Sequence, residues 1–595
     1  MEEGSIPVAL TPSAAHEFDR KDIEYFIPED FLTESELLAL YRQGHRESEL
    51  DKFKIKLAES INDHYNKSHK QKIDMGFLLF REFSFLFDTV YSKSYLTEKI
   101  IEKTKPSSIT LLTDKSYPLQ LKEIDTFSER NSLANITYFI LKEICSHTGI
   151  EFNVLRSTET SRLRRHKRVR GGWVVEKKRT ILRRTCRRLI IILSIEMNNL
   201  LCFKKNSVLF YTLDVGAEKW IKDFLRGKKH KVFIFLKDNS RLKIFSKLIN
   251  KNLLTSSPSY PESSDKFDYK ETVLELNSLC NVKVNELLEP FMDVIISRWI
   301  PTIYYYFTQW ESIIKKRNVK YIVLTSASTL KDMSLISAAK NSKTSKSILV
   351  SHGDNIFDNP NYDYGGVPIY FSDYFFASNA ERASYYKEIV ASLGIETKVA
   401  LNSDRLRSSI IKRRKKHGRT KVLYIPGFFM VNKLRIDGAE YTANWYYKFQ
   451  RGLIKFFSEL EDYDFIWKGT VNLNDVFYPS PIKYFIEESK FNNVFARIDS
   501  FLENLKECDL FFTDLPSTTF YEAIVNGFPV LGAYREGLKP REEVLKLSGK
   551  SLVRFKELDD LKPHIIEFLT SDPELYRVNL QLENKSLYDS LITQK

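Results

Sequence analysis

Short apolar runs alternate with stretches of helical spacing along most of this 595-residue chain, and this rhythm constrains the fold more than any other feature. In the middle of the chain the runs lie at residues 108–113, 152–155, 208–213, 232–236, 321–325, 348–351 and 374–377. Strands that are apolar throughout and separated by helices pair in parallel and are covered on both faces. The sequence therefore predicts the α/β fold class.

A polar, charged stretch at residues 405–420 interrupts the alternation, which restarts after it. Further strand-like runs lie at 422–425, 465–467, 494–498, 510–513 and 528–532. Two α/β units on either side of a linker predict two Rossmann-like domains that face a cleft. We expect a helical N-terminal region at 1–105, a first Rossmann-like domain at 106–404 with a basic insertion at 156–206, a second such domain at 420–565 and a helical tail at 566–595.

The segment from Asp514 to Pro529 has the pattern of a strand end, a loop and a helix. Asp514 follows an apolar strand, at the carboxyl end where open α/β sheets bind their ligands. Ser517 is a natural N-cap, with Thr518 and Thr519 in the first helical turn. A helix N-terminus favours an anion by ~0.3–2 kcal/mol, and three hydroxyls add donors. The segment therefore predicts a phosphate site that needs neither a lysine nor a metal.

Three neighbouring features extend this site. Glu522 lies more than one turn into the helix, where it could reach a ribose or sugar hydroxyl. Lys468 ends a predicted strand and could neutralise phosphate. Pro426–Gly427 follows the first strand of the second domain and would let the backbone approach a ligand. The simpler alternatives are a capping box without a ligand, a solvated surface lysine and a tight turn. Phe520 stands where a capping box needs Glu or Gln, which favours the ligand.

The net charge of +14 is concentrated in one segment. Residues 156–188 contain 14 Lys or Arg and 2 Asp or Glu, and the apolar stretch 189–201 follows. Basic residues beside a short apolar helix suit an anionic membrane surface. A solvated insertion whose helix packs on the domain is an equal alternative. RNA binding is the weakest, because few aromatic residues lie among the charges.

The five cysteines are scattered without metal-ligand spacing, which favours reduced thiols in a cytoplasmic protein. The acidic N-terminus has no secretory signal, and no apolar stretch reaches the ~18–20 residues of a membrane span.

The residues Thr-Asp-Leu-Pro-Ser-Thr-Thr-Phe-Tyr-Glu-Ala-Ile-Val-Asn-Gly-Phe-Pro-Val, from 513 to 530, resemble the donor-binding signature of GT-B glycosyltransferases. The resemblance is to enzymes of bacterial surface and capsular polysaccharide biosynthesis, and it covers about residues 320–535. It includes the His-Gly turn at 348–354, the segment 401–406 before the interdomain crossover, and Trp-Lys-Gly at 467–469. Relatives often have a His-Pro pair after that lysine, and it is absent here.

This resemblance implies a metal-independent transferase that needs no cofactor beyond its nucleotide-sugar donor. The donor would lie on the second domain, and a glycan or lipid-linked acceptor would enter from the first. His352 would be the general base, with Asp354 and Asp358 as rival bases. The enzyme would be cytoplasmic or peripheral at the inner face of the cytoplasmic membrane. The alternatives are a nucleotide-sugar 2-epimerase and a non-catalytic scaffold associated with membrane or RNA.

Overall fold

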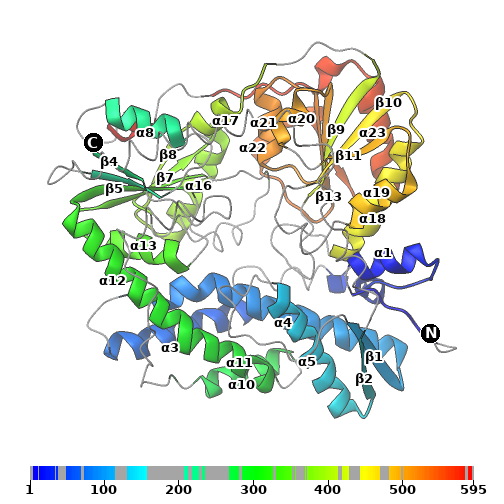
Figure 1. The fold of residues 1–595 in the computed structure, drawn as a ribbon, viewed down its shortest axis with the longest axis horizontal. Helices are drawn as coiled ribbons and strands as arrows, with labels where there is room; N and C mark the ends of the chain where they lie inside the picture. The colour runs from blue at the N-terminus through cyan, green and yellow to red at the C-terminus, as the bar shows by residue number, and fades with distance from the viewer. Residues whose placement is uncertain are drawn as a thin grey trace, which may run out of the picture.

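A computed structural model shows two α/β domains side by side above a layer of helices (Figure 1). It describes residues 5–10, 12–33, 35–37, 49–68, 73–113, 130–156, 207–211, 217–226, 231–234, 267, 269–280, 284–325, 330–351, 356, 369, 372–412, 418–427, 443–469, 481–497, 500–582 and 587–592. The basic insertion expected at 156–206 lies, except for residue 156, outside these residues. None of the helices described is long and apolar enough to span a membrane.

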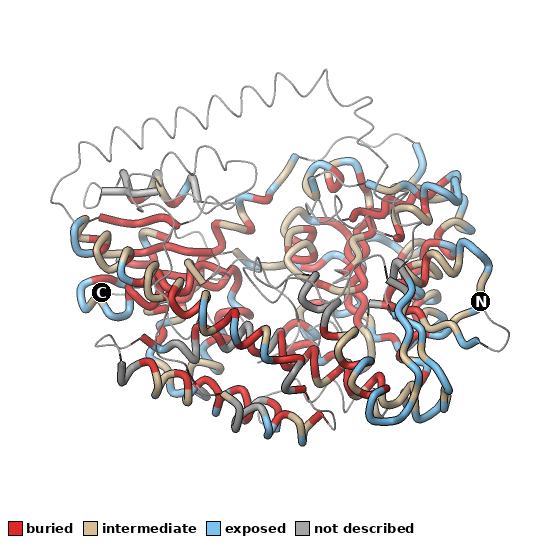
Figure 2. Tube along the Cα trace, turned by 60° about the horizontal axis from the view of Figure 1, so that its bottom comes forward, coloured by how far each residue is buried: buried red, intermediate tan, exposed pale blue. Residues whose placement is uncertain are grey.

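The layer beneath the domains is helical. Its elements are α3 (Glu49–Ser68), α4 (Met75–Thr104), α5 (Arg130–Thr148), α10 (Lys270–Cys280), α11 (Asn285–Val294), the π-helical turn η2 (Ile295–Trp299) and α12 (Ile300–Lys316). The inner residues of α12 recur at helical spacing and are buried (Figure 2). They share one apolar cluster with the inner residues of α3 and α4 and with one face of the first domain's sheet, so the layer and the first domain have a common core.

The first domain has a six-stranded parallel sheet in the order β4-β3-β5-β6-β7-β8. Its elements are β3 (Ser207–Phe210), α8 (Ala217–Arg226), β4 (Lys231–Ile234), β5 (Val319–Leu324), α13 (Leu330–Asn341), β6 (Lys346–Val350), β7 (Tyr374–Ala377), α16 (Ala380–Leu393), β8 (Lys398–Leu401) and α17 (Asp404–Ser408). Alternate strand residues belong to two different apolar clusters, so both faces are covered, as expected for a parallel sheet.

The second domain has the Rossmann strand order, β11-β10-β9-β12-β13-β14, and all its strands are parallel. Its elements are β9 (Thr420–Ile425), α18 (Ala443–Ser458), β10 (Tyr463–Lys468), α19 (Pro481–Ser489), β11 (Val494–Arg497), α20 (Phe501–Leu505), β12 (Leu510–Thr513), α21 (Thr518–Val525), β13 (Val530–Arg535), α22 (Glu542–Ser548), β14 (Leu552–Phe555) and α23 (Leu558–Thr570). Val422 and Leu423 of β9 lie in the clusters on opposite faces. The predicted α/β class with two Rossmann-like domains is confirmed.

Four strands differ from the sequence prediction. β1 (Ser108–Thr113) and β2 (Glu151–Arg156) fall within the range expected for the first domain, yet they pair only with each other, in a separate two-stranded sheet. β8 and β14 were not predicted, and each forms the edge of its domain's sheet.

The two ends of the chain are exchanged between the domains. Ala9 and Ala15, the latter in α1 (Pro12–Arg20), lie in an apolar cluster of the second domain. The side-chain amide of Asn444 at the start of α18 donates to the Ala9 carbonyl at 2.9 Å. Leu587 and Leu591 of α24 (Leu587–Ile592) lie instead in an apolar cluster of the first domain, beside β3 and α8. The chain therefore passes three times between the domains.

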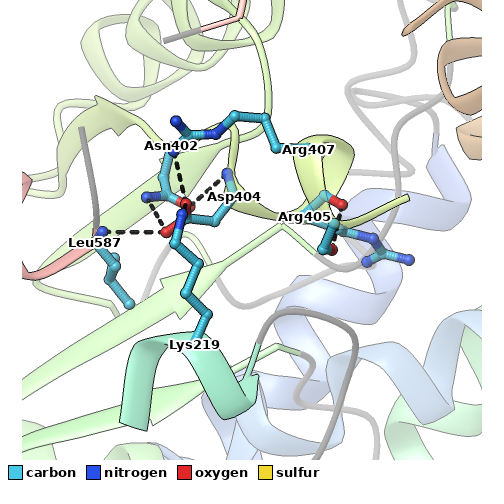
Figure 3. Close-up of polar contacts among 7 residues, drawn as sticks. Lys219, Asn402, Asp404, Arg405, Arg407 and Leu587 are labelled. Carbon is cyan, nitrogen blue, oxygen red and sulfur yellow. Dashed lines mark hydrogen bonds and ion pairs between the residues drawn. The ribbon is translucent and has the colours of Figure 1, made fainter. Parts of the chain in front are cut away.

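A buried carboxylate ties together the last two of these passages (Figure 3). Asp404 opens α17, directly before the chain enters the second domain, and its side chain is fully buried. It accepts hydrogen bonds from Lys219, from Arg407 at 2.6 Å, and from the Leu587 backbone N–H at 3.3 Å. Burial alone would raise the pKa of Asp404, but these cations and Asn402 outweigh it, so the pKa is lowered.

Replacing Asp404 with Ala should release α24 and lower the free energy of unfolding by roughly 2–4 kcal/mol, since a buried acceptor of charged donors is lost. Urea denaturation measures the stability, and hydrogen exchange of residues 587–592 measures the release. The control Asp559→Ala removes an exposed partner of Lys562 and should change stability by less than ~0.5 kcal/mol. Unchanged protection of α24 in Asp404→Ala would contradict this role.

Candidate functional site

The candidate site lies at the topological switch point of the second sheet. The strand order reverses between β9 and β12, where Ile425 pairs with Thr513. Pro426–Gly427 follows β9 and Asp514 follows β12, so both segments leave the sheet at its carboxyl edge, side by side. Open α/β sheets bind ligands in the crevice at such a point.

Asp514 organises this edge from inside the protein. Its carboxylate is fully buried and accepts hydrogen bonds from Tyr424 Oη at 2.6 Å, Tyr446 Oη at 2.8 Å and the Gly427 backbone N–H at 2.9 Å. These donors join β9, the turn after it and the first helical turns of α18. The position predicted for Asp514 is correct, and the geometry gives its side chain a contact with the turn.

Burial raises the pKa of Asp514 to about 6, although its three donors favour the charged form. The folded protein therefore binds this proton more tightly than the unfolded chain between about pH 4 and pH 6. The contribution of Asp514 to the free energy of unfolding is full below pH 4 and declines as the pH rises to about 6.

Gly427 is needed because the turn passes very close to the loop after β12. A Cβ at this position would lie 2.9 Å from Leu515 Cδ2 and 3.0 Å from Tyr446 Oη. Gly532 in β13 has a similar role, because a Cβ there would lie 2.8 Å from the ring of Pro516. The loop that leads into α21 is thus held between two strands where only glycine fits without a shift.

The start of α21 has hydroxyl groups that the helix itself does not use. Ser517 is the N-cap residue, as predicted, but its side chain makes no capping hydrogen bond. Thr519 Oγ1 is buried and has no hydrogen-bond partner among the residues that the structure describes. A capped helix would satisfy its own first N–H groups. This one instead leaves the positive end of its dipole next to unused donors, which suits an anionic group.

Lys468 lies at the carboxyl edge of the second sheet, and Glu522 lies further along α21. Lys468 ends β10 and is largely buried, and its Nζ donates to the Gly469 carbonyl at 2.8 Å. It is therefore an ordered lysine, in contrast to the solvated surface residue of the simpler interpretation. Glu522 is half-buried on α21, and its backbone carbonyl accepts from Asn526 Nδ2 at 2.7 Å.

His352, Asp354 and Asp358 lie outside the described residues. The residue before them, Ser351, follows β6 at the carboxyl edge of the first sheet. Its carbonyl accepts from Arg405 at 3.3 Å, and the Arg405 side chain points away from the Asp404 cluster (Figure 3).

Sequence reasoning missed the two tyrosines that hold Asp514. They are separated from it by 90 and 68 residues, and no local pattern links them. It also missed the contact across the domains: Tyr521 of α21 donates to Glu381 of α16 at 3.1 Å. In the described part of the chain, no group of three or more His, Cys, Asp or Glu side chains could hold a metal ion.

A cavity of about 500 Å³ lies elsewhere, between the end of α1 and one side of α18. It is lined by acidic residues of the N-terminal segment, Asp19, Asp22 and Glu24, and by Lys448, Arg451 and Lys455 of the helix. None of the predicted site residues contributes to its walls, and its mixed charges select no class of ligand.

No protein-family model matches the sequence, and no curated protein is detectably related to it. Several solved structures are distantly similar. A UDP-GlcNAc 2-epimerase from Neisseria meningitidis bound to UDP-GlcNAc is 12% identical with a TM-score of 0.40, over 65% of this chain and 98% of that one. The enzyme of that name from Methanocaldococcus jannaschii, with UDP-GlcNAc and UDP, is 12% identical with a TM-score of 0.37, over 66% and 99%. A glycosyltransferase from Rickettsia africae is 13% identical with a TM-score of 0.33, over 63% and 91%. Scores this low carry no argument about activity.

Replacing Asp514 with Asn tests the buried carboxylate. Because the Asn side chain does not titrate, the stability of the variant relative to wild type should improve by roughly 2–3 kcal/mol between pH 4 and pH 7. Urea denaturation at pH 4, 5.5 and 7 gives the free energies of unfolding, and Asp559→Asn, at an exposed carboxylate, is the control. A difference between variant and wild type that stays constant with pH would refute the raised pKa.

Replacing Gly427 with Ala should push the turn away from Leu515 and lower the free energy of unfolding by about 1–3 kcal/mol, the usual cost of overpacking. Thermal unfolding measures the loss. The double variant Gly427→Ala/Leu515→Ala removes Leu515 Cδ2, the nearest clashing atom, so its loss of stability should be smaller than the sum of the two single-variant losses. Strict additivity would rule out the contact with Leu515 Cδ2 as the cause.

Proposed function

We propose that this protein is a metal-independent glycosyltransferase that moves a sugar, or a related group, from a nucleotide-activated donor to a cell-surface glycan or lipid-linked acceptor. One observation carries the proposal: the uncapped start of α21, with the buried and unpaired hydroxyl of Thr519, lies at the switch point of a Rossmann-ordered sheet. The sequence resemblance described above supports it on the same residues.

In this proposal the donor diphosphate binds at the start of α21. The hydroxyls of Ser517, Thr518 and Thr519 and the first N–H groups of the helix donate to its oxygens. The ammonium of Lys468 adds positive charge at the end of the neighbouring strand. Glu522 binds a ribose or sugar hydroxyl. Pro426–Gly427 lets the backbone come close to the nucleotide, and Asp514 fixes that turn through the Gly427 N–H.

The acceptor enters from the carboxyl edge of the first sheet. His352 removes the proton from its hydroxyl as general base, and Asp354 is the alternative base at the same turn. As the bond between the sugar and the phosphate breaks, negative charge grows on the leaving phosphate, and the start of α21 stabilises it. The remaining acceleration comes from holding donor and acceptor together.

The membrane part of the proposal depends on residues 156–201, whose basic and apolar halves would hold the enzyme at the inner face of the cytoplasmic membrane. A protein recruited there meets lipid-linked acceptors directly. Each basic residue near an anionic surface contributes ~1 kcal/mol. Nucleic acid is the partner that this segment fits least.

The Thr519 hydroxyl offers a sharp test of the donor site. In Thr519→Val a methyl group replaces a buried, unpaired hydroxyl, so the ligand-free protein should be as stable as wild type or more stable. Its affinity for the donor should nevertheless fall by roughly 10–100-fold, because a hydrogen bond to a charged phosphate is lost.

Thermal-shift assays with UDP-, GDP-, CDP- and CMP-linked sugars identify the donor and measure this affinity, since a ligand at 100 times its Kd adds ~2.7 kcal/mol to the free energy of unfolding.

Ser517→Ala should weaken the same ligand, and Thr570→Val, an exposed threonine of α23, should have no effect on it. If wild type gives no shift with any of these compounds, the donor site does not exist. Product analysis then separates the alternatives for a protein that binds: transfer yields a glycosylated acceptor, a 2-epimerase yields an epimerised nucleotide sugar, and a scaffold yields neither.

A further inference from the structure

A buried ion pair joins the two domains beside the start of α21. Arg541, the N-cap residue of α22 in the second domain, contacts Glu381 in the first turn of α16 in the first domain. Arg541 Nε and Nη2 donate to the two oxygens of the Glu381 carboxylate, the second at 3.0 Å. The side chains are 2% and 8% exposed, so this is a bidentate pair shielded from solvent.

Two aromatic residues complete the contact. Tyr521 of α21 is fully buried and donates to Glu381 Oε2 at 3.1 Å. The guanidinium of Arg541 lies 4.8 Å from the ring centre of Tyr385, one turn further along α16. Tyr521 follows Thr518 by three residues, which is about 5 Å along a helix. The interdomain contact is therefore within one helical turn of the candidate phosphate site.

The backbone of Arg541 makes a second connection across the domains. Its N–H donates to the Ile356 carbonyl at 3.0 Å, and Ile356 is fully buried in an apolar cluster of the second domain. Ile356 belongs to the chain between β6 and β7 of the first sheet and follows His352 by four residues. One residue of the second domain thus holds two separate elements of the first.

A buried charge pair joins two domains only if both charges keep their partners. Taking two charges out of water is costly, and the cost is offset only while both partners and their hydrogen bonds stay in place. Opening the contact would leave each charge without its partner, so intermediate separations are disfavoured. The pair therefore fixes a single distance between α16 and α21, whereas an apolar interface would let the two helices slide past each other.

We propose that Arg541, with Glu381 and Tyr521, is a positioning cluster: it fixes the start of the donor helix α21 against the acceptor edge of the first domain. The inference rests on the proposed function and adds residues that touch neither donor nor acceptor. Arg541 holds α16 through its side chain and the chain after β6 through its backbone. Loss of the side chain should separate the reacting groups without disturbing the donor site on the second domain.

Arg541→Gln and Glu381→Gln, singly and together, test the cluster. With water as the acceptor, we expect each single variant to hydrolyse the donor identified by the thermal-shift panel, and so release its nucleotide, roughly 100-fold more slowly, the effect of a displacement of about 1 Å. The Kd of the donor should change by less than about threefold, since an interaction lost only in the transition state lowers kcat alone. The double variant should be no slower than either single one, because both remove the same contact.

Hydrogen exchange gives a readout independent of turnover. Peptides covering 378–386 and 518–526 should exchange faster in both single variants, and Arg541→Lys, which keeps the charge, should restore part of the protection. The matched control is Arg554→Gln, which breaks an exposed pair with Glu536 within the second domain and should change neither exchange nor turnover.

The results that would overturn the proposal are wild-type exchange in both single variants, or losses of turnover that multiply in the double variant. An increase in the donor Kd equal to the loss of kcat would also overturn it. If wild type binds no nucleotide sugar, the proposed function fails by itself, while the exchange experiment still decides whether the pair holds the domains together.

Discussion

The carboxylate of Asp404 ties together two points at which the chain crosses between the domains. The chain leaves the first domain directly after this residue and returns to it at Leu587. The backbone N–H of Leu587 donates a hydrogen bond to the same carboxylate. The pair Glu381–Arg541 is a charged contact between the domains themselves. Buried, charge-assisted hydrogen bonds thus fix both the crossing points of the chain and one contact between the domains. Such bonds require definite distances, whereas apolar contact alone tolerates sliding.

The domain architecture could be predicted because the central strands are apolar on both faces. Such continuous apolar runs can be recognised in the sequence without knowing which strands they pair with. The edge strands β8 and β14 could not be predicted in this way. Lys398–Leu401 and Leu552–Phe555 are short and partly exposed, so they lack a continuous apolar signal. The strands β1 and β2 were recognised as strands, but their partner is not encoded locally. A run of alternating or apolar residues says that a strand exists and leaves open which sheet it joins.

For the candidate site, the positions of the residues could be predicted, but their side-chain contacts could not. Strand ends and helix starts follow from local pattern, which located Gly427, Asp514 and Ser517. The direction of their side chains does not follow, because it depends on partners far away in the chain. The donors to Asp514, Tyr424 and Tyr446, come from β9 and α18, and they turn a carboxylate expected to face a ligand into the support of a turn. The bases proposed at 352–358 still depend on the sequence alone.

The exchange of the chain ends has a consequence for synthesis on the ribosome. The last strand of the first sheet ends at Leu401, yet Leu587 and Leu591 cover part of that sheet. At ~5–20 residues per second this cover arrives roughly 10–40 s later. Residues 9–27 wait even longer for the second domain against which they pack. The first domain therefore cannot be completed as it emerges, and the N-terminal segment keeps its apolar face exposed until the second domain has been synthesised.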